Sequence, residues 1–204
     1  TAAGNDAWQR LPDMNEPRWY PTVSMMGDGT MTVYGGTEES PPLPHNTYET
    51  FDPQTDTWTT YPGPSLGVLG NYPRMHLLST GEIFRSGHTR YSAKLVHPGQ
   101  WTLTAQTLGN RLDEATLLMP TPPGYSDYIM IIGGMNNAAG QVYSSVQYCN
   151  ASSSTPSDWQ WQDAPPLNIG RWRLNAVILP DKSILAVGGT ASEVPLTVSV
   201  PPCW

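Results

Sequence analysis

The 204-residue sequence has few charges, only two lysines and only two cysteines. Charged residues make up 13% of the chain, against about 25% in an average soluble domain, so hydroxyl and amide side chains must form much of the surface. With so few lysines and a formal net charge of −7, the chain lacks a basic patch that would bind phosphates, which argues against a nucleic-acid partner. No apolar run approaches the ~20 residues that a membrane-spanning helix needs.

Helix-compatible stretches are also missing, because the chain carries 19 glycines and 21 prolines. This density of helix-breaking residues excludes a helical bundle or a coiled coil. The aromatic content argues against disorder: the chain has 8 Trp, 10 Tyr and 2 Phe, and its apolar residues recur in short blocks. The composition therefore predicts a globular, β-rich domain.

Three features favour an extracellular, secreted protein. Lysines are few, hydroxyl side chains are many, and a glycosylation sequon stands at Asn150-Ala151-Ser152 in a polar stretch that we expect to be an exposed loop. The chain opens at Thr1 without a signal peptide, so we expect a mature or excised segment. For the two cysteines, Cys149 and Cys203, an intrachain disulfide and two free thiols both remain open.

A repeat of about 50 residues organises the chain. Its mark is an apolar run closed by a glycine pair or near-pair, where we expect backbones to approach closely. Each pair is preceded by two short strand-like runs that flank a turn, which is longer in the third unit. We expect these runs to form inner hairpins at Thr22–Tyr34, Met75–Phe84, Ala115–Ile132 and Ala176–Val187. Turn residues such as Asp28-Gly29 and Thr80-Gly81 supply the positive φ that a tight hairpin needs. The four marks are Val33-Tyr34-Gly35-Gly36, Phe84-Arg85-Ser86-Gly87, Ile131-Ile132-Gly133-Gly134 and Ala186-Val187-Gly188-Gly189.

After the first three marks a second hairpin follows, with a Tyr and then a Trp, and we expect the Trp on the outer strand, packed between neighbouring units. The pairs are Tyr48 with Trp58, Tyr91 with Trp101 and Tyr148 with Trp159. Each unit then holds four strands in sequence and cannot bury both of its faces alone. Radial packing against neighbouring units solves this, as in the blades of a β-propeller, and the order Gly-Gly, Tyr, Trp at this period is the kelch pattern.

We therefore predict one all-β domain over residues 1–204, a kelch-type β-propeller of about four four-stranded antiparallel blades. The blades fall approximately at 12–62, 70–108, 110–164 and 165–204. Residues 7–11, around Trp8, resemble an outer strand that belongs to a preceding blade or closes the last one. The chain is then either a segment of a larger propeller or a small closed ring.

The segments around these hairpins resemble the secreted copper-radical oxidases, the galactose oxidase and glyoxal oxidase family. The resemblance rests on Arg18-Trp19-Tyr20-Pro21-Thr22, on Asn71-Tyr72-Pro73-Arg74-Met75-His76-Leu77-Leu78 and on Arg171–Gly189. It implies that the chain contains central blades of a seven-bladed propeller. It also implies copper as the cofactor if the full-length parent is an active oxidase.

In that family two tyrosines and two histidines hold the copper on the propeller axis, and one tyrosine carries a radical and a thioether link to cysteine. By motif, Tyr20 falls at the radical tyrosine's position. The match stops there, because this chain has no cysteine before Cys149 and no Tyr-His dipeptide. Thr37 and Glu38 stand where the aromatic residue that stacks on the galactose oxidase tyrosine is expected.

Other metal-binding and acid-base candidates are weak. His76 and His88 are the best remaining metal candidates, since one hairpin could bring them near the channel mouth. The alternative is that all four histidines, including His45 and His97, are solvated or packed. The adjacent carboxylates Asp113 and Glu114 would point to opposite faces of a strand.

Three functions remain as hypotheses. The chain as it stands is a structural or interaction propeller, whose partners are the remainder of the propeller or neighbouring chains of an assembly. Alternatively, it is part of an active oxidase that converts alcohols or aldehydes with release of hydrogen peroxide. The third possibility is a glycan-binding module that uses exposed Trp and Tyr side chains.

Overall fold

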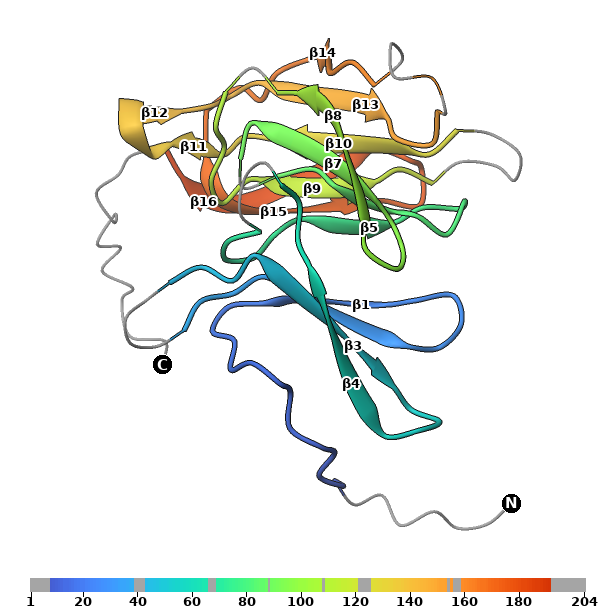
Figure 1. Cartoon of the computed structure of the whole chain (residues 1–204). Coiled ribbons are helices and arrows are strands. Elements are labelled where there is room, and N and C mark those ends of the chain that lie inside the picture. The colour runs from blue at the N-terminus through green and yellow to red at the C-terminus, as the bar shows by residue number, and fades with distance from the viewer. Residues whose placement is uncertain are drawn as a thin grey trace, which may run out of the picture.

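The computed structural model describes residues 8–38, 43–65, 69–87, 89–107, 109–120, 126–153, 155 and 159–191. Among these residues, the main strands form three four-stranded antiparallel sheets followed by a two-stranded one. Figure 1 shows how the sheets are arranged. A short ribbon of β11 (Met135–Asn136) and β12 (Gln141–Val142) encloses a 3-10 turn at Asn137–Ala139. In the described part of the chain, no helix is long and apolar enough to cross a membrane.

Apart from the ribbon of β11 and β12, the strands of each sheet follow one another along the chain. Sheet 1 contains β1 (Thr22–Met25), β2 (Met31–Tyr34), β3 (Thr47–Asp52) and β4 (Thr57–Pro62). Sheet 2 contains β5 (Met75–Leu77), β6 (Ile83–Arg85), β7 (Tyr91–Val96) and β8 (Gln100–Gln106). Sheet 3 contains β9 (Ala115–Leu118), β10 (Tyr128–Ile132), β13 (Val146–Asn150) and β14 (Gln162–Ala164), and sheet 4 contains β15 (Trp172–Ile178) and β16 (Ile184–Thr190).

The four predicted inner hairpins are confirmed, and each pairs in antiparallel register. In sheet 1 Thr22 pairs with Tyr34, and in sheet 3 Ala115 pairs with Ile132. The turn of the first hairpin works as the sequence indicates, because Asp28 accepts bonds from the backbone and hydroxyl of Thr30. A four-stranded antiparallel sheet whose strands follow in chain order is the blade of a propeller.

Three hydrophobic clusters join the sheets face to face. The cluster between sheets 1 and 2 contains the buried rings of Tyr34 and Tyr48 and is flanked by Trp101. Between sheets 2 and 3, Phe84 packs with Cys149 and Trp159, among others. Between sheets 3 and 4 the buried members are Ala115, Ile132, Val146 and Leu174. The core of the protein therefore lies between sheets and not within any one of them.

The glycine pairs lie where one sheet meets the next. Both glycines of the first pair have positive φ, and the N–H of Gly36 donates to the carbonyl oxygen of Gly70 in the lead-in to sheet 2. Gly134 makes the equivalent bond to Arg171 ahead of sheet 4. A Cβ atom at Gly35 would lie 2.3 Å from the oxygen of Gly70, so no side chain can replace this hydrogen. The predicted close approach of backbones is thus present at the first and third glycine pairs.

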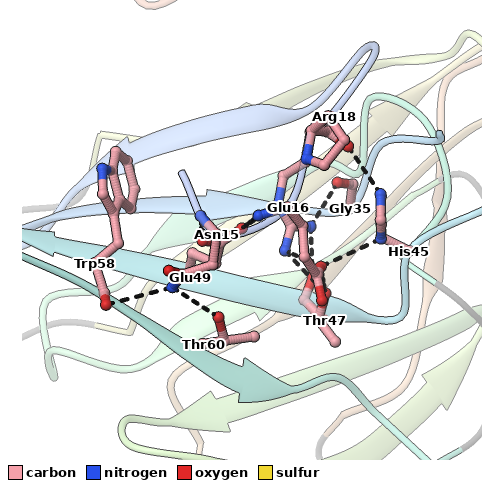
Figure 2. A network of polar contacts seen from close by, with 10 residues as sticks. Asn15, Glu16, Arg18, Gly35, His45, Thr47, Glu49, Trp58 and Thr60 are labelled. Carbon is pink, nitrogen blue, oxygen red and sulfur yellow. Dashed lines mark hydrogen bonds and ion pairs between the residues drawn. The ribbon is translucent and has the colours of Figure 1, made fainter. Parts of the chain in front are cut away.

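A buried arginine ties the lead-in of sheet 1 to its inner strands, as Figure 2 shows. The side chain of Arg18 is inaccessible to solvent and donates from Nε to Glu49 and from Nη1 to the carbonyl oxygens of Gly35 and Thr47. In sheet 3, Arg111 repeats the pattern with the oxygens of Gly133 and Ser145. In both sheets the guanidinium joins the glycine pair to the start of the third strand.

Two local expectations differ from the structure. Trp159, predicted on an outer strand and packed between blades, packs in the cluster between sheets 2 and 3 as predicted but precedes the outer strand β14 (Gln162–Ala164). The exposed loop expected from Cys149 onward begins later: β13 extends to Asn150, since Cys149 and Ala151 pack in the same cluster. Residues 8–11 have no strand partner in the described structure, so an outer strand there stays a prediction.

Replacing Gly35 by Ala should lower the free energy of unfolding by about 2–4 kcal/mol, because the added Cβ meets backbone and the residue must keep a positive φ. Gly29→Ala is the matched control, since Gly29 also has positive φ but nothing lies within 4 Å of the added Cβ. It should cost only about 1–2 kcal/mol. Urea unfolding of both variants measures the difference, and equal losses would contradict the close-approach explanation.

Removing the guanidinium by Arg18→Met should destabilise the fold by about 3–5 kcal/mol, because it leaves the Glu49 carboxylate buried without its cation. Arg10→Met breaks an ion pair with Asp13 in which both side chains are exposed. That control should cost less than about 1 kcal/mol. Denaturant midpoints at neutral pH test the pair, and similar midpoints would show that the buried network contributes little.

Candidate functional site at the axial pocket

Four residues with left-handed backbone, one from the lead-in or start of each sheet, define the candidate site. We call them the axial residues. None is glycine, although φ near +50° to +60° is costly for ordinary side chains. Backbone strain of this kind is concentrated at functional sites, so its occurrence in four residues, one per sheet, indicates a candidate site. The axial residues are Tyr20, Tyr72, Asp113 and Arg173, with φ of 60°, 49°, 51° and 57°.

All four axial residues line one pocket, a hollow of about 490 Å³ that also includes Arg74, Leu174 and Asn175. Backbone bonds fix their spacing. The N–H of Tyr72 donates to the carbonyl oxygen of Tyr20 at 2.8 Å, and that of Arg173 donates to Asp113 at 2.8 Å. The pocket wall is therefore set by main-chain geometry, and the side chains project from it.

Charges of both signs lie in and beside the pocket. Nε of Arg173 is 3.2 Å from a carboxylate oxygen of Asp113, and the guanidinium of Arg173 also lies over the ring of Trp172. Nε of Arg74 is 3.4 Å from the carboxylate of Glu114, which is almost fully buried. Both guanidiniums keep further N–H groups of their fork, so the pocket can donate hydrogen bonds to a polar ligand.

An aromatic ridge borders the pocket. The rings of Tyr20 and Tyr72 stack with centroids 4.8 Å apart, and Trp19 lies 5.2 Å from Tyr20. All three side chains are exposed. A second hollow is lined by Trp19, Tyr20 and Thr37, among others. Tyr20 thus lines both hollows.

The residues predicted from sequence are placed very differently. Tyr20 lies in the axial pocket. His76 does not line it: its Nε2 lies 3.0 Å from the hydroxyl of Ser86. His88 lies outside the described residues. The carboxylates of Asp113 and Glu114 each face an arginine and not each other.

The two modification sites remain predictions. Asn150 is the last residue of β13, and its side-chain oxygen lies 3.5 Å from the hydroxyl of Ser152. Cys149 is buried, which raises the pKa of its thiol to about 12. Cys203 lies outside the described residues, so the pairing of the cysteines is still open.

Copper requires converging imidazole, phenolate or thiolate donors, and this pocket offers a different set. Its described lining holds two tyrosines, one carboxylate already paired with an arginine, an amide and two guanidinium groups. Searching the described residues finds no group of three His, Cys, Asp or Glu side chains that could hold a metal. The described lining of this pocket therefore does not fit a copper ion.

Comparison with known proteins supports the repeat. No family model matches the chain. Two F-box/kelch-repeat proteins of Arabidopsis thaliana are similar to parts of it. One is 46% identical over 52 residues, which cover 25% of this chain and 15% of that protein. The other is 32% identical over 107 residues, which cover 47% and 25% of the two chains. The matched parts span a quarter or less of these relatives.

Two solved structures share the fold. A fungal alcohol oxidase of the AA5 family, in complex with copper, superposes with a TM-score of 0.71 at 19% identity over 89% of this chain and 39% of its own. YjhT superposes with a TM-score of 0.69 at 16% identity over 92% of this chain and 64% of its own. The chain has the kelch β-propeller fold and spans part of the length of these larger propellers.

Stability should fall on acidification because of His76. Burial, helped by the nearby charge of Arg74, lowers the pKa of His76 from 6.5 to about 4. Between these values the unfolded chain binds a proton that the folded chain does not, so the free energy of unfolding should decrease as pH falls from about 6.5 to about 4, by up to about 3 kcal/mol. Urea titrations across this range should show the slope, and His76→Asn should flatten it. An unchanged slope in the variant would assign the effect to another group.

Proposed function

We propose that this chain is an interaction segment of a secreted kelch propeller, which binds a small polar ligand at the axial pocket and is not an oxidase as it stands. The observation that carries the proposal is the convergence of Tyr20, Tyr72, Asp113 and Arg173, one from each sheet, on a single hollow. An extracellular location is supported by the scarcity of lysine and by the sequon at Asn150.

The chemistry of the pocket favours a ligand with a flat apolar face and several hydroxyl groups. Exposed stacked rings at Tyr20 and Tyr72 offer a surface on which such a face can pack. The guanidiniums of Arg74 and Arg173, with the amide of Asn175, offer donors around it. A sugar ring combines these two properties, so glycans are the first ligand class to test.

A second candidate function is part of a copper-radical oxidase assembled from a longer chain. The observation that favours it is the position of Tyr20, which is 43% exposed and faces the pocket in a fold that superposes on a copper-containing alcohol oxidase. Its other copper ligands would have to come from outside these 204 residues. A lone phenol, with a pKa near 10, is a poor ligand at neutral pH.

Ligand binding can be tested by calorimetric titration of the chain with a panel of mono- and oligosaccharides. Tyr72→Ala should weaken binding about fivefold, since a stacked ring contributes on the order of 1 kcal/mol. Arg173→Ala should weaken it as well. Tyr128→Ala, which alters an exposed tyrosine of β10 outside the pocket, is the control and should leave the affinity unchanged. Binding that is absent, or insensitive to both pocket variants, would contradict a ligand role for this pocket.

The oxidase alternative is tested by measuring copper retention and hydrogen peroxide production. After equilibration with Cu(II) and dialysis, the isolated chain should retain less than stoichiometric copper and should produce no hydrogen peroxide from galactose or methylglyoxal. Stoichiometric copper with turnover would establish the second candidate in place of the first. Copper retained without turnover would show that this chain forms a metal site of another kind.

A further inference from the structure

The sequence contains a single N-glycosylation sequon, Asn150-Ala151-Ser152, which takes no part in the axial pocket. Its backbone and hydroxyl are held in place. The N–H of Ala151 donates to the carbonyl oxygen of Asp127 at 2.8 Å, and the N–H of Asp127 donates to the hydroxyl of Ser152 at 2.7 Å. The Ser152 hydroxyl in turn lies 3.5 Å from the side-chain oxygen of Asn150. The three residues of the sequon therefore have a fixed arrangement at the end of β13.

Asn150 occupies a position of the sheets that stays open to solvent. It is the last residue of β13 and comes directly after the buried Cys149. In sheet 2 the equivalent residue is Val96, the last residue of β7, which comes directly after the buried Leu95. Val96 is 48% exposed even though sheet 3 packs against sheet 2. A bulky, hydrophilic sugar can therefore be accommodated at this end of a third strand.

A tyrosine lies directly opposite Asn150 on the same side of sheet 3. Tyr128 pairs with Asn150 in the antiparallel register of β10 and β13. Directly opposed residues project from the same face of a sheet, with Cβ atoms about 4.5–5.5 Å apart. Tyr128 is 37% exposed, and its ring centroid lies 6.2 Å from that of Tyr148, two residues before Asn150. Two aromatic rings therefore stand on the face from which the asparagine side chain projects.

The hydrogen bonds around this face leave the modifiable atom available. Among the described residues, none accepts a hydrogen bond from the amide nitrogen of Asn150, whose side-chain oxygen faces Ser152. The hydroxyl of Tyr148 donates to the side-chain oxygen of Gln162 at 2.8 Å, which holds the inner ring in place. A sugar on the Asn150 nitrogen would therefore break no hydrogen bond of the described structure.

We propose that Asn150 carries an N-linked glycan whose first N-acetylglucosamine ring packs on the ring of Tyr128. The inference rests on the secreted location in the proposed function but not on the axial pocket. In the transfer, the amide nitrogen of Asn150 bonds to C1 of the sugar, and the bond from C1 to the diphosphate of a lipid-linked donor breaks. The lipid diphosphate and one amide proton leave. Donor and transferase belong to the secretory pathway.

The contact between sugar and ring is intramolecular, which determines its strength. A sugar attached to Asn150 meets Tyr128 at an effective concentration on the order of millimolar or above. Free sugars lack this tether, so Tyr128→Ala still serves as the control in the calorimetric titrations. Because Tyr128 and Asn150 are brought together by the pairing of β10 with β13, the contact exists only in the folded chain. The glycan should therefore stabilise the fold.

The first experiment measures occupancy of Asn150. The 204-residue chain is secreted from a eukaryotic cell line behind an added, cleavable signal peptide. It carries Asp28→Asn as an internal standard, because this change creates a second sequon with Gly29 and Thr30 in the exposed turn after β1. Peptide mass spectrometry after enzymatic deglycosylation in heavy-oxygen water reports both positions. Asn150 should reach at least about half the occupancy of the standard, Asn150→Gln should lose its glycan alone, and Ser152→Thr should retain it.

The second experiment measures the contact with Tyr128. Urea unfolding compares the glycosylated chain of natural sequence with the same chain made in bacteria, which carries no sugar. The glycan should lower the unfolding equilibrium constant about fivefold, as a single ring contact does, and Tyr128→Ala should abolish this difference. The glycan at position 28, in an Asn150→Gln background, is the matched control. Its effect on stability should be the same with and without the Tyr128 ring.

Two results would overturn the proposal. An unmodified Asn150 in chains whose standard sequon is occupied would refute the modification site. Equal stabilisation by the glycan with Tyr128 and with Tyr128→Ala would refute the contact. Neither result bears on the axial pocket, because neither residue lines it. Since the signal peptide is supplied, a chain that proves not to be secreted from its own cells would refute the proposed location and leave both measurements standing.

Discussion

The structure depends on one constraint: its sheets are apolar on both faces, so no sheet can be stable by itself. The clusters between sheets, with Tyr34 and Tyr48 at one junction and Ile132 and Leu174 at another, supply the burial that a single antiparallel sheet lacks. Adjacent backbones must then come close at the inner ends of the strands, and the glycine pairs permit this. The same close approach would leave carbonyl oxygens of the glycine pairs without a hydrogen-bond partner. Arg18 donates to the oxygen of Gly35, and Arg111 donates to that of Gly133.

This constraint explains why much of the fold could be predicted from the sequence. A turn residue, an apolar run and a glycine pair are local features, and they recur because each sheet solves the same packing problem. The hairpin at Ala115–Ile132 was predicted even though its turn differs from the others. Trp159 shows the limit: the order Gly-Gly, Tyr, Trp predicts its packing between two sheets correctly, but not that it lies before the outer strand β14.

The candidate site was harder to predict. Tyr20 was found through resemblance, but Tyr72, Asp113 and Arg173 were not associated with it, because their shared property is a left-handed backbone that non-glycine residues rarely adopt. Two sequence features could have suggested that the four residues belong together. Tyr20 and Tyr72 both precede a proline, and all four residues lie shortly before or at the start of an inner strand. The ion pair between Asp113 and Arg173 joins residues sixty positions apart, which no local pattern reveals.

The bonds that set the axial pocket run between main-chain atoms, from the N–H of Tyr72 to the oxygen of Tyr20 and from that of Arg173 to the oxygen of Asp113. The side chains at these positions are therefore not needed to hold the pocket wall in place. Such a propeller can replace an aromatic side chain by a charged one in the axial pocket while the main-chain bonds stay the same. The ligand selectivity of the pocket can therefore change faster than the fold. The pocket of this protein is accordingly a natural place to randomise residues in search of new binding specificities.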